Sequence, residues 1–177
     1  MDSEVKLQIL FTRDEIAAAL RRLASEIKRD YHGKCPLLIG ILKGSFMFLA
    51  DLIRLLDFPL EVDFIGLSSY GTGRQTSGRV RVVQGLTCPV NGRHVLIIED
   101  IVDAGLTISF LIEYLLKKKP ASLQLCALMD KPARRQAQVP IDYLGFTVPD
   151  KFVVGYGLDY AGKYRNLPDI CVLEGDE

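Results

Sequence analysis

The chain has 177 residues, of which 49% are hydrophobic and 25% are charged, as is typical of one globular domain with a substantial core. Lys plus Arg and Asp plus Glu both number 22, so the overall charge argues against a nucleic acid or an anionic membrane as the main partner. There is no basic segment followed by an apolar run at the N-terminus, and no apolar stretch of bilayer-spanning length. We therefore expect a single cytoplasmic domain over residues 1–177, with its four widely spaced cysteines reduced.

The first half of the chain predicts helices that alternate with buried strands. Thr12 and Glu15 have the spacing of a helix capping box, and apolar residues then recur at helical spacing from Ile16 until His32-Gly33 ends the pattern. The other elements predicted here are a strand over Leu37–Leu42, a helix over Phe46–Leu56, a strand over Leu60–Ser69, and a polar, glycine-rich mobile loop over Tyr70–Gly78.

The second half continues the alternation. Arg79–Gln84 alternates basic and apolar side chains, and Asn91-Gly92 marks a turn. Further predicted elements are strands over His94–Ile98, Leu123–Met129, Tyr143–Phe146, Phe152–Tyr156 and Ile170–Leu173, and a helix from about Thr107 to Lys118. Because strands that alternate with helices form right-handed crossovers, the predicted fold class is α/β, with a mainly parallel twisted sheet flanked by helices.

The segment over residues 95–107 carries the strongest chemical signal. An apolar strand ends in two adjacent carboxylates, Glu99 and Asp100, and Asp103 follows just before a glycine-containing turn. Ligands of open α/β sheets bind beyond the carboxyl ends of the strands. The turn from Asp103 to Thr107 would aim backbone N–H groups at a phosphate, and Gly105 would allow a close approach. Since the acids can accept hydrogen bonds from sugar hydroxyls and help to hold hydrated Mg²⁺, the segment predicts a sugar-phosphate site.

This segment resembles the phosphoribosyl-diphosphate signature of the type I phosphoribosyltransferases, and the flanking segments narrow the resemblance to the hypoxanthine-guanine phosphoribosyltransferases. Leu42-Lys43-Gly44-Ser45 resembles the pyrophosphate loop of that family, and Ser68-Ser69-Tyr70-Gly71 resembles its lid. Asp130-Lys131-Pro132 and residues 152–160 resemble its purine pocket and second metal position. The matches follow the same order along nearly the whole chain, so the resemblance also implies a small hood and a flexible lid loop.

The resemblance implies a Mg²⁺-dependent purine-salvage transferase. Such an enzyme converts hypoxanthine or guanine and 5-phosphoribosyl 1-diphosphate to IMP or GMP and diphosphate through an oxocarbenium-like transition state. Positioning and electrostatic stabilisation of the leaving group would provide most of the catalysis. The family is commonly dimeric or tetrameric, so we expect a homodimer or homotetramer, with no nucleic-acid or membrane partner.

The resemblance also assigns roles to residues of this chain. Asp103 matches the proposed general base, Lys131 would donate to the 6-oxo group of the purine, and Phe152 would stack on the ring. The Val153 backbone would read the base edge, and Ser69 and Tyr70 would close over the sugar. A non-proline cis peptide is expected at Lys43-Gly44. The remaining assignments are sugar-phosphate binding by Glu99, Asp100, Asp103, Ala104, Gly105, Leu106 and Thr107, diphosphate binding by Lys43, Gly44 and Arg165, metal binding by Glu99, Asp100 and Asp159, and a purine-pocket position for Asp159.

Ala104 departs from the family pattern, which usually has Thr or Ser at this position to bond the 5′-phosphate. The missing hydroxyl should weaken the affinity for the sugar phosphate without abolishing the site. Arg134-Arg135 fits either a surface role or a subunit contact.

Three other functions remain as alternatives: a signalling receiver domain, an RNA-binding regulator like the pyrimidine attenuation proteins, and a xanthine-guanine phosphoribosyltransferase. The first needs a phosphoacceptor Asp two strands after its acid pair, and Asp130 is only a faint candidate. The second needs a basic face, which the neutral composition does not favour. The third differs in the recognition of one exocyclic group, which sequence separates poorly.

Overall fold

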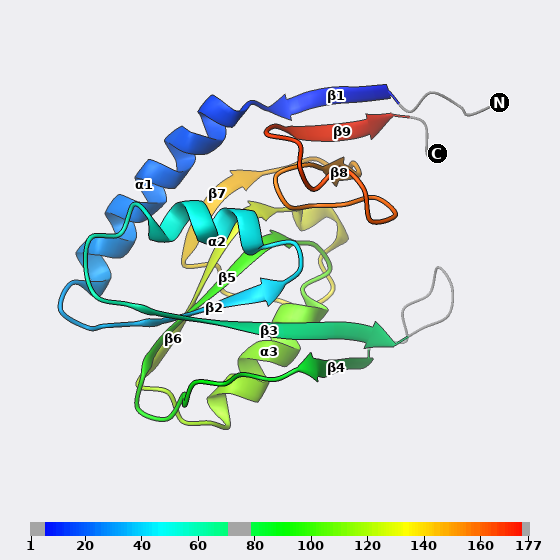
Figure 1. Cartoon of the computed structure of the whole chain (residues 1–177). Coiled ribbons are helices and arrows are strands. Elements are labelled where there is room, and N and C mark those ends of the chain that lie inside the picture. The colour runs from blue at the N-terminus through cyan, green and yellow to red at the C-terminus, as the bar shows by residue number, and fades with distance from the viewer. Residues whose placement is uncertain (1–5, 71–78, 175–177) are drawn as a thin grey trace.

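The computed structural model describes residues 6–70 and 79–174. A six-stranded sheet forms the centre of the molecule, with strand order β4-β3-β2-β5-β6-β7 (Figure 1). The strands from β3 to β7 in this order are parallel, and β4 pairs antiparallel with β3. This arrangement confirms the predicted mainly parallel sheet. The strand bounds are β2 Leu37–Leu42, β3 Glu61–Tyr70, β4 Arg79–Gln84, β5 His94–Val102, β6 Ser122–Asp130 and β7 Tyr143–Thr147.

Helices cover both faces of the sheet, as its apolar central strands require. Helices α1 (Arg13–Tyr31) and α2 (Phe46–Ile53) pack on one face, and α3 (Leu106–Leu116) packs on the other. Successive residues of β2 serve different faces: Leu38 belongs to the core under α1 and α2, whereas Leu37 and Ile39 belong to the core under α3. The predicted capping box of α1 is present.

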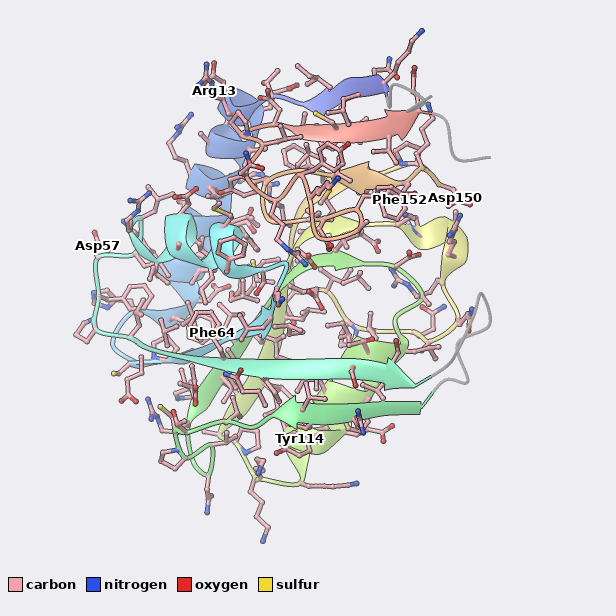
Figure 2. All side chains as sticks on the ribbon, turned by 45° about the vertical axis from the view of Figure 1, so that its right-hand side comes forward. Arg13, Asp57, Phe64, Tyr114, Asp150 and Phe152 are labelled. Atoms are coloured by element: carbon pink, nitrogen blue, oxygen red, sulfur yellow. The ribbon has the colours of Figure 1, made fainter. Side chains whose placement is uncertain are left out.

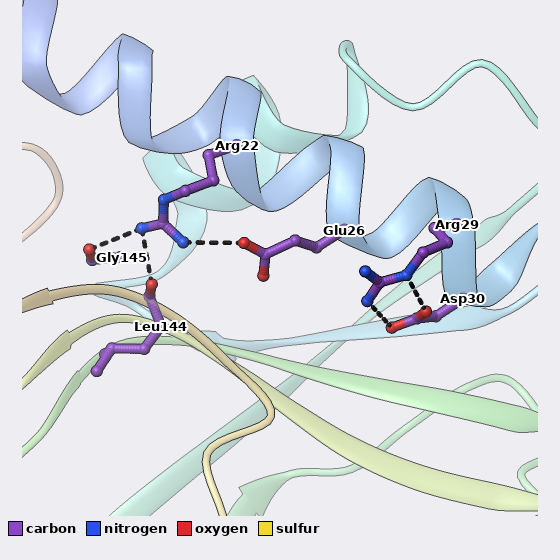
Figure 3. Close-up of polar contacts among 6 residues, drawn as sticks. All are labelled: Arg22, Glu26, Arg29, Asp30, Leu144 and Gly145. Atoms are coloured by element: carbon purple, nitrogen blue, oxygen red, sulfur yellow. Dashed lines mark hydrogen bonds and ion pairs between the residues drawn. The ribbon is translucent and has the colours of Figure 1, made fainter.

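Arg22 on α1 fixes this helix to β7, which is the last strand of the sheet (Figure 3). Its Nη2 donates to the carbonyl oxygens of Leu144 at 2.9 Å and Gly145 at 3.0 Å, and its Nη1 donates to Glu26 on the next helical turn. The two carbonyl acceptors lie on an edge strand that lacks a further strand to bond. Arg22 therefore supplies hydrogen-bond donors to backbone carbonyls of the edge strand.

A second, smaller sheet forms the hood. Strands β1 (Lys6–Phe11), β9 (Ile170–Glu174) and β8 (Val153–Val154) pair antiparallel in the order β1-β9-β8. Figure 1 shows this sheet above the central one, and the chain between β8 and β9 extends toward the carboxyl ends of the parallel strands. The sequence did not predict β1. No helix in the described part of the chain is long and apolar enough to span a membrane.

Strand β5, which leads into the acid residues, is longer than predicted. The sequence predicted that it ends at Ile98, but β5 continues to Val102 because Glu99, Ile101 and Val102 pair with β6. Glu99 and Asp100 therefore lie within the strand. Helix α2 is shorter than predicted and ends at Ile53, and a short 3₁₀ helix, Pro132–Arg134, follows β6.

Candidate active site

The turn between β5 and α3 has the form expected of a phosphate loop. Gly105 adopts φ 83°, a left-handed conformation that side chains disfavour, and a Cβ there would lie 2.5 Å from the carbonyl oxygen of Ala137. Only glycine fits this position. The turn opens onto a cavity of about 430 Å³. The cavity is lined by Ser69, Val80, Arg134, Gln136 and every residue from Glu99 to Ile108, so it contains the whole predicted sugar-phosphate set.

Two acids form part of the wall of this first cavity. Glu99 is buried, and its Oε1 accepts a hydrogen bond of 3.0 Å from the backbone N–H of Asp100. Burial, with a smaller contribution from the charge of Asp100, raises the pKa of Glu99 well above its ordinary value. Asp100 is half-buried and lines a second cavity as well. Asp100 is therefore better placed than Glu99 to face two substrate groups.

The second cavity, of about 370 Å³, adjoins the first, since both are lined by Asp100, Ile101, Asp103 and Arg134. Four separate segments contribute to it: the segment with Asp100 and Asp103, and residues in or next to three of the four segments that flank it in the family resemblance, the lid segment being the exception. Its other lining residues are Lys43, Gly44, Lys131, Phe152, Val153, Leu158, Asp159 and Arg165. The fold thus brings together residues that are up to 122 positions apart in the sequence, from Lys43 to Arg165.

The loop after β2 contains a cis peptide, but one bond earlier than expected. The sequence placed it at Lys43-Gly44, and the structure has it at Leu42–Lys43. Gly44 has a different requirement: a Cβ on it would lie 1.7 Å from Asp100 Oδ2. The loop therefore packs directly against the acid wall.

Lys131 and Asp103 form an ion pair in the lining of the second cavity. Lys131 is buried, and its Nζ lies 3.7 Å from Asp103 Oδ2. The backbone N–H of Lys131 donates to the Val102 carbonyl at 2.9 Å, which fixes the residue against the end of β5. Asp103 Oδ1 is buried and accepts no hydrogen bond from any described residue. The Asp103 side chain as a whole is 43% exposed and lines both cavities, so a ligand can reach its carboxylate.

Phe152 provides an exposed aromatic face at the mouth of this cavity. It is 49% exposed, which is unusual for phenylalanine, and Figure 2 shows it beside Asp150 on the side where the central strands end. The ring of Tyr160 meets it edge-on, with 5.6 Å between ring centroids. This contact leaves a face of Phe152 open to stack on a planar ligand.

Asp159 and Arg165 lie on the hood side of the second cavity. Arg165 Nη2 lies 2.8 Å from Asp159 Oδ1, and its Nη1 donates to the Gly157 carbonyl at 2.7 Å. Asp159 Oδ2 accepts from the Gly162 N–H at 2.8 Å. These contacts hold a cation and a carboxylate side by side in a cavity whose lining also includes Lys43 and Gly44.

The described residues contain no group of three or more His, Cys, Asp or Glu side chains that could hold a metal alone. Asp100 and Asp159 line the same cavity, whereas Glu99 lines only the first. Mg²⁺ is usually held by one or two carboxylates together with water and substrate phosphates. The two hard oxygen donors of Asp100 and Asp159 fit such an ion.

The structure also adds residues that the sequence analysis did not assign to the site. Arg134 lines both cavities and pairs with Asp150, and Gln136 lines the first. Arg135 lines neither cavity and forms an ion pair with Asp130. The sequence could not predict that Arg134 lines the cavities while Arg135 does not. Residues of a loop have no regular periodicity from which the direction of each side chain can be inferred. Ser69 lines the first cavity, whereas the Tyr70 side chain and the rest of the expected lid, residues 71–78, lie outside the described residues.

The fold and site together define a known class of protein. The sequence-family model for the phosphoribosyl transferase domain matches residues 8–161 of this chain. The chain therefore belongs to the phosphoribosyltransferase family. The hypoxanthine-guanine phosphoribosyltransferase of Bacillus subtilis is 47% identical over 167 residues, which cover 94% of this chain and 93% of that protein. These relationships place the chain among the hypoxanthine-guanine phosphoribosyltransferases, as the resemblance indicated.

Solved structures agree with this placement. A hypoxanthine phosphoribosyltransferase from Staphylococcus aureus superposes with a TM-score of 0.92 at 42% identity, over 98% of this chain and 96% of that one. The bifunctional protein TilS/HprT of Listeria monocytogenes is also similar, at 46% identity over 94% of this chain. The chain spans 26% of the length of that relative.

Proposed function

We propose that this chain transfers the ribose 5-phosphate group of 5-phosphoribosyl 1-diphosphate to hypoxanthine or guanine, giving IMP or GMP and diphosphate. One observation supports the proposal: the cavity at the β5–α3 turn and the cavity beside Lys131 and Phe152 share Asp100, Ile101, Asp103 and Arg134 as a common wall. A sugar phosphate in the first cavity would therefore present its reacting carbon to a base in the second. Holding two reactants in this way removes much of the entropic cost of their reaction.

Residues 103–107 would hold the 5′-phosphate through backbone N–H groups and the Thr107 hydroxyl, and Glu99 and Asp100 would accept from the ribose hydroxyls. The bond between the anomeric carbon and diphosphate breaks, and its electron pair leaves with diphosphate. Lys43, Arg165 and the Gly44 backbone lie where they can stabilise that charge. Mg²⁺ on Asp100 and Asp159 would neutralise further charge on the departing group.

The base would lie between Phe152 and the Lys131–Asp103 contact. Lys131 Nζ would donate to the 6-oxo group, Phe152 would stack on the ring, and the Val153 backbone would read its edge. A purine ring nitrogen forms the new bond to carbon, and the ring loses a proton. The Asp103 carboxylate, which lines this cavity, would accept that proton. Ser69 and Tyr70 would close over the sugar and exclude water.

The experiment is a comparison of initial rates. Purified protein with Mg²⁺ and phosphoribosyl diphosphate is given hypoxanthine, guanine, xanthine or adenine, and the nucleoside monophosphate is quantified. Adenine should be nearly inert, because a 6-amino group cannot accept from Lys131. Turnover of adenine at the rate of hypoxanthine would contradict the proposal, and a preference for xanthine would reassign the substrate within the same family.

We also expect the enzyme to act in the cytoplasm and to be a homodimer or homotetramer. The family resemblance supports both expectations. Light scattering coupled to size-exclusion chromatography measures the subunit number directly, and a monomer at micromolar concentration would contradict the second.

A further inference from the structure

The back of the phosphate loop is held by one short segment, residues 135–137. Arg135 Nε donates to the Asp103 carbonyl at 3.0 Å. The backbone N–H groups of Gln136 and Ala137 donate to the Ala104 carbonyl at 2.9 and 3.0 Å. Two successive carbonyls of the loop therefore face this segment.

This orientation determines where the loop points its N–H groups. Leu42–Lys43 is the single cis peptide within the described ranges, so the peptides after Asp103 and Ala104 are trans. In a trans peptide the C=O and N–H point in opposite directions. The N–H groups of Ala104 and Gly105 consequently point away from residues 135–137, and these two residues line the first cavity. Successive N–H groups on one side of a turn form a concave site for an anion.

Arg135 is itself held in place. Its Nη2 pairs with Asp130 Oδ1, and the two side chains are only 13% and 17% exposed. Its Cδ lies 3.1 Å from the position that a Cβ of Gly105 would occupy, so it packs closely behind the loop. Neither Arg135 nor Asp130 lines either of the two cavities. The contacts of Arg135 are therefore with the loop and with Asp130 rather than with the cavity lining.

We propose that Arg135, held by Asp130, is a positioning residue that orients the Ala104 and Gly105 N–H groups toward the sugar phosphate. The inference rests on the proposed assignment of this loop to the 5′-phosphate. The role matters more in this chain because Ala104 lacks the hydroxyl that would supply another donor. The backbone donors must then provide a larger share of the binding.

Arg135→Lys separates this role from a merely structural one. A lysine can keep the charge pair with Asp130, but it has no Nε to donate to the Asp103 carbonyl. Ribose 5-phosphate is titrated into ¹⁵N-labelled protein, and the amide resonances of Ala104 and Gly105 are followed. We expect R135K to weaken ribose 5-phosphate binding at least about fivefold, with the KM for hypoxanthine changed less than about twofold. The thermal midpoint should stay near that of the wild type.

A second variant covers the case in which R135K is destabilised. D130N/R135M removes both charges and leaves no unpaired buried ion, and it should weaken ribose 5-phosphate binding about tenfold or more. Arg93→Met is the control, since Arg93 forms an ion pair with Glu61 next to the starts of the strands and lines neither cavity, and it should bind like the wild type.

The outcomes separate the two proposals. If the Ala104 and Gly105 resonances of the wild type do not respond to ribose 5-phosphate, the assignment of the loop is wrong. If they respond and both Arg135 variants bind with wild-type affinity, the loop is the phosphate site but Arg135 does not position it.

Discussion

The backbone of Gly44 packs against the carboxylate of Asp100 so closely that a methyl group on Gly44 would lie 1.7 Å from Asp100 Oδ2. The contact joins the loop after β2 to the acid wall of β5. It sets the separation between the expected diphosphate-binding loop and a proposed metal ligand.

Gly44→Ala should therefore reduce turnover severely. Either Asp100 or the loop must move by more than 1 Å, and a misplacement of this size can cost about 100-fold in rate. Steady-state kinetics would measure the loss. Gly85→Ala is the control, because a Cβ on Gly85 meets nothing within 4 Å. Wild-type turnover in G44A would show that the spacing is not critical.

Lys131→Met should affect the base more than the sugar. The substitution removes the proposed donor to the 6-oxo group and keeps most of the side-chain volume. A hydrogen bond that involves a charged group contributes about 1.5–3 kcal/mol, so the KM for hypoxanthine should rise by at least about tenfold. The KM for phosphoribosyl diphosphate should change little, and Lys117→Met on the exposed end of α3 should leave both unchanged. A larger effect on the sugar than on the base would refute the role of Lys131.

Asp159→Ala should weaken the binding of Mg²⁺. Asp159 lines the same cavity as Asp100 and holds Arg165 at 2.8 Å, so its loss removes a proposed metal donor and releases a proposed diphosphate ligand. Rates measured over a Mg²⁺ titration should show a higher half-saturating concentration and a lower maximum. Asp57→Ala, on an exposed turn, is the control. Full turnover of D159A at saturating Mg²⁺ would mean that Asp159 is not a metal ligand.

Ala104→Ser should improve affinity for the sugar phosphate. The serine hydroxyl adds a donor to a charged group, for which about 1.5 kcal/mol is a modest estimate, or about tenfold in the KM for phosphoribosyl diphosphate. Initial rates at varied phosphoribosyl diphosphate would measure this gain. Ala121→Ser, on the exposed turn before β6, should change nothing. An unchanged or increased KM in A104S would indicate that the loop does not present position 104 to the phosphate.

Asp63 should make stability depend on pH. Burial alone would raise the pKa of Asp63, but the N–H groups of Cys88, Phe64 and Thr87, with the Thr87 hydroxyl, outweigh burial and lower it below 3.8. A carboxylate with a lowered folded-state pKa stabilises the protein above its unfolded-state pKa, and this contribution is lost as the pH falls through its folded-state pKa.

Asp63→Asn should accordingly be less stable than the wild type by about 1.5–3 kcal/mol at pH 7. The difference should shrink as the pH falls below about 4, where Asp63 of the unfolded chain becomes protonated, and should be lost below the lower pKa of the folded state. Urea unfolding of both proteins at pH 7 and at about pH 3 would measure it. A difference that is constant over this range would exclude the charge of Asp63 as the source.

The sequence by itself determined the local elements and the chemistry of the central segment. The capping box at Thr12 and Glu15, the apolar run of β2 and the glycine turn before α3 all follow from interactions between residues close in the chain. The order of the motifs was enough to identify the family, which the comparisons confirm. The roles of the individual site residues, and the assignment of residues 1–177 to a single domain, remain predictions.

Only the tertiary structure decided the features that depend on distant partners. Strand β1 exists because it pairs with β9, more than 150 residues away, and β5 extends past Ile98 because β6 lies beside it. Arg135 lies behind the phosphate loop because β6 ends next to β5. Local propensity cannot specify such pairings, since the free energy that selects them comes from burial and hydrogen bonds that form only when the sheet assembles.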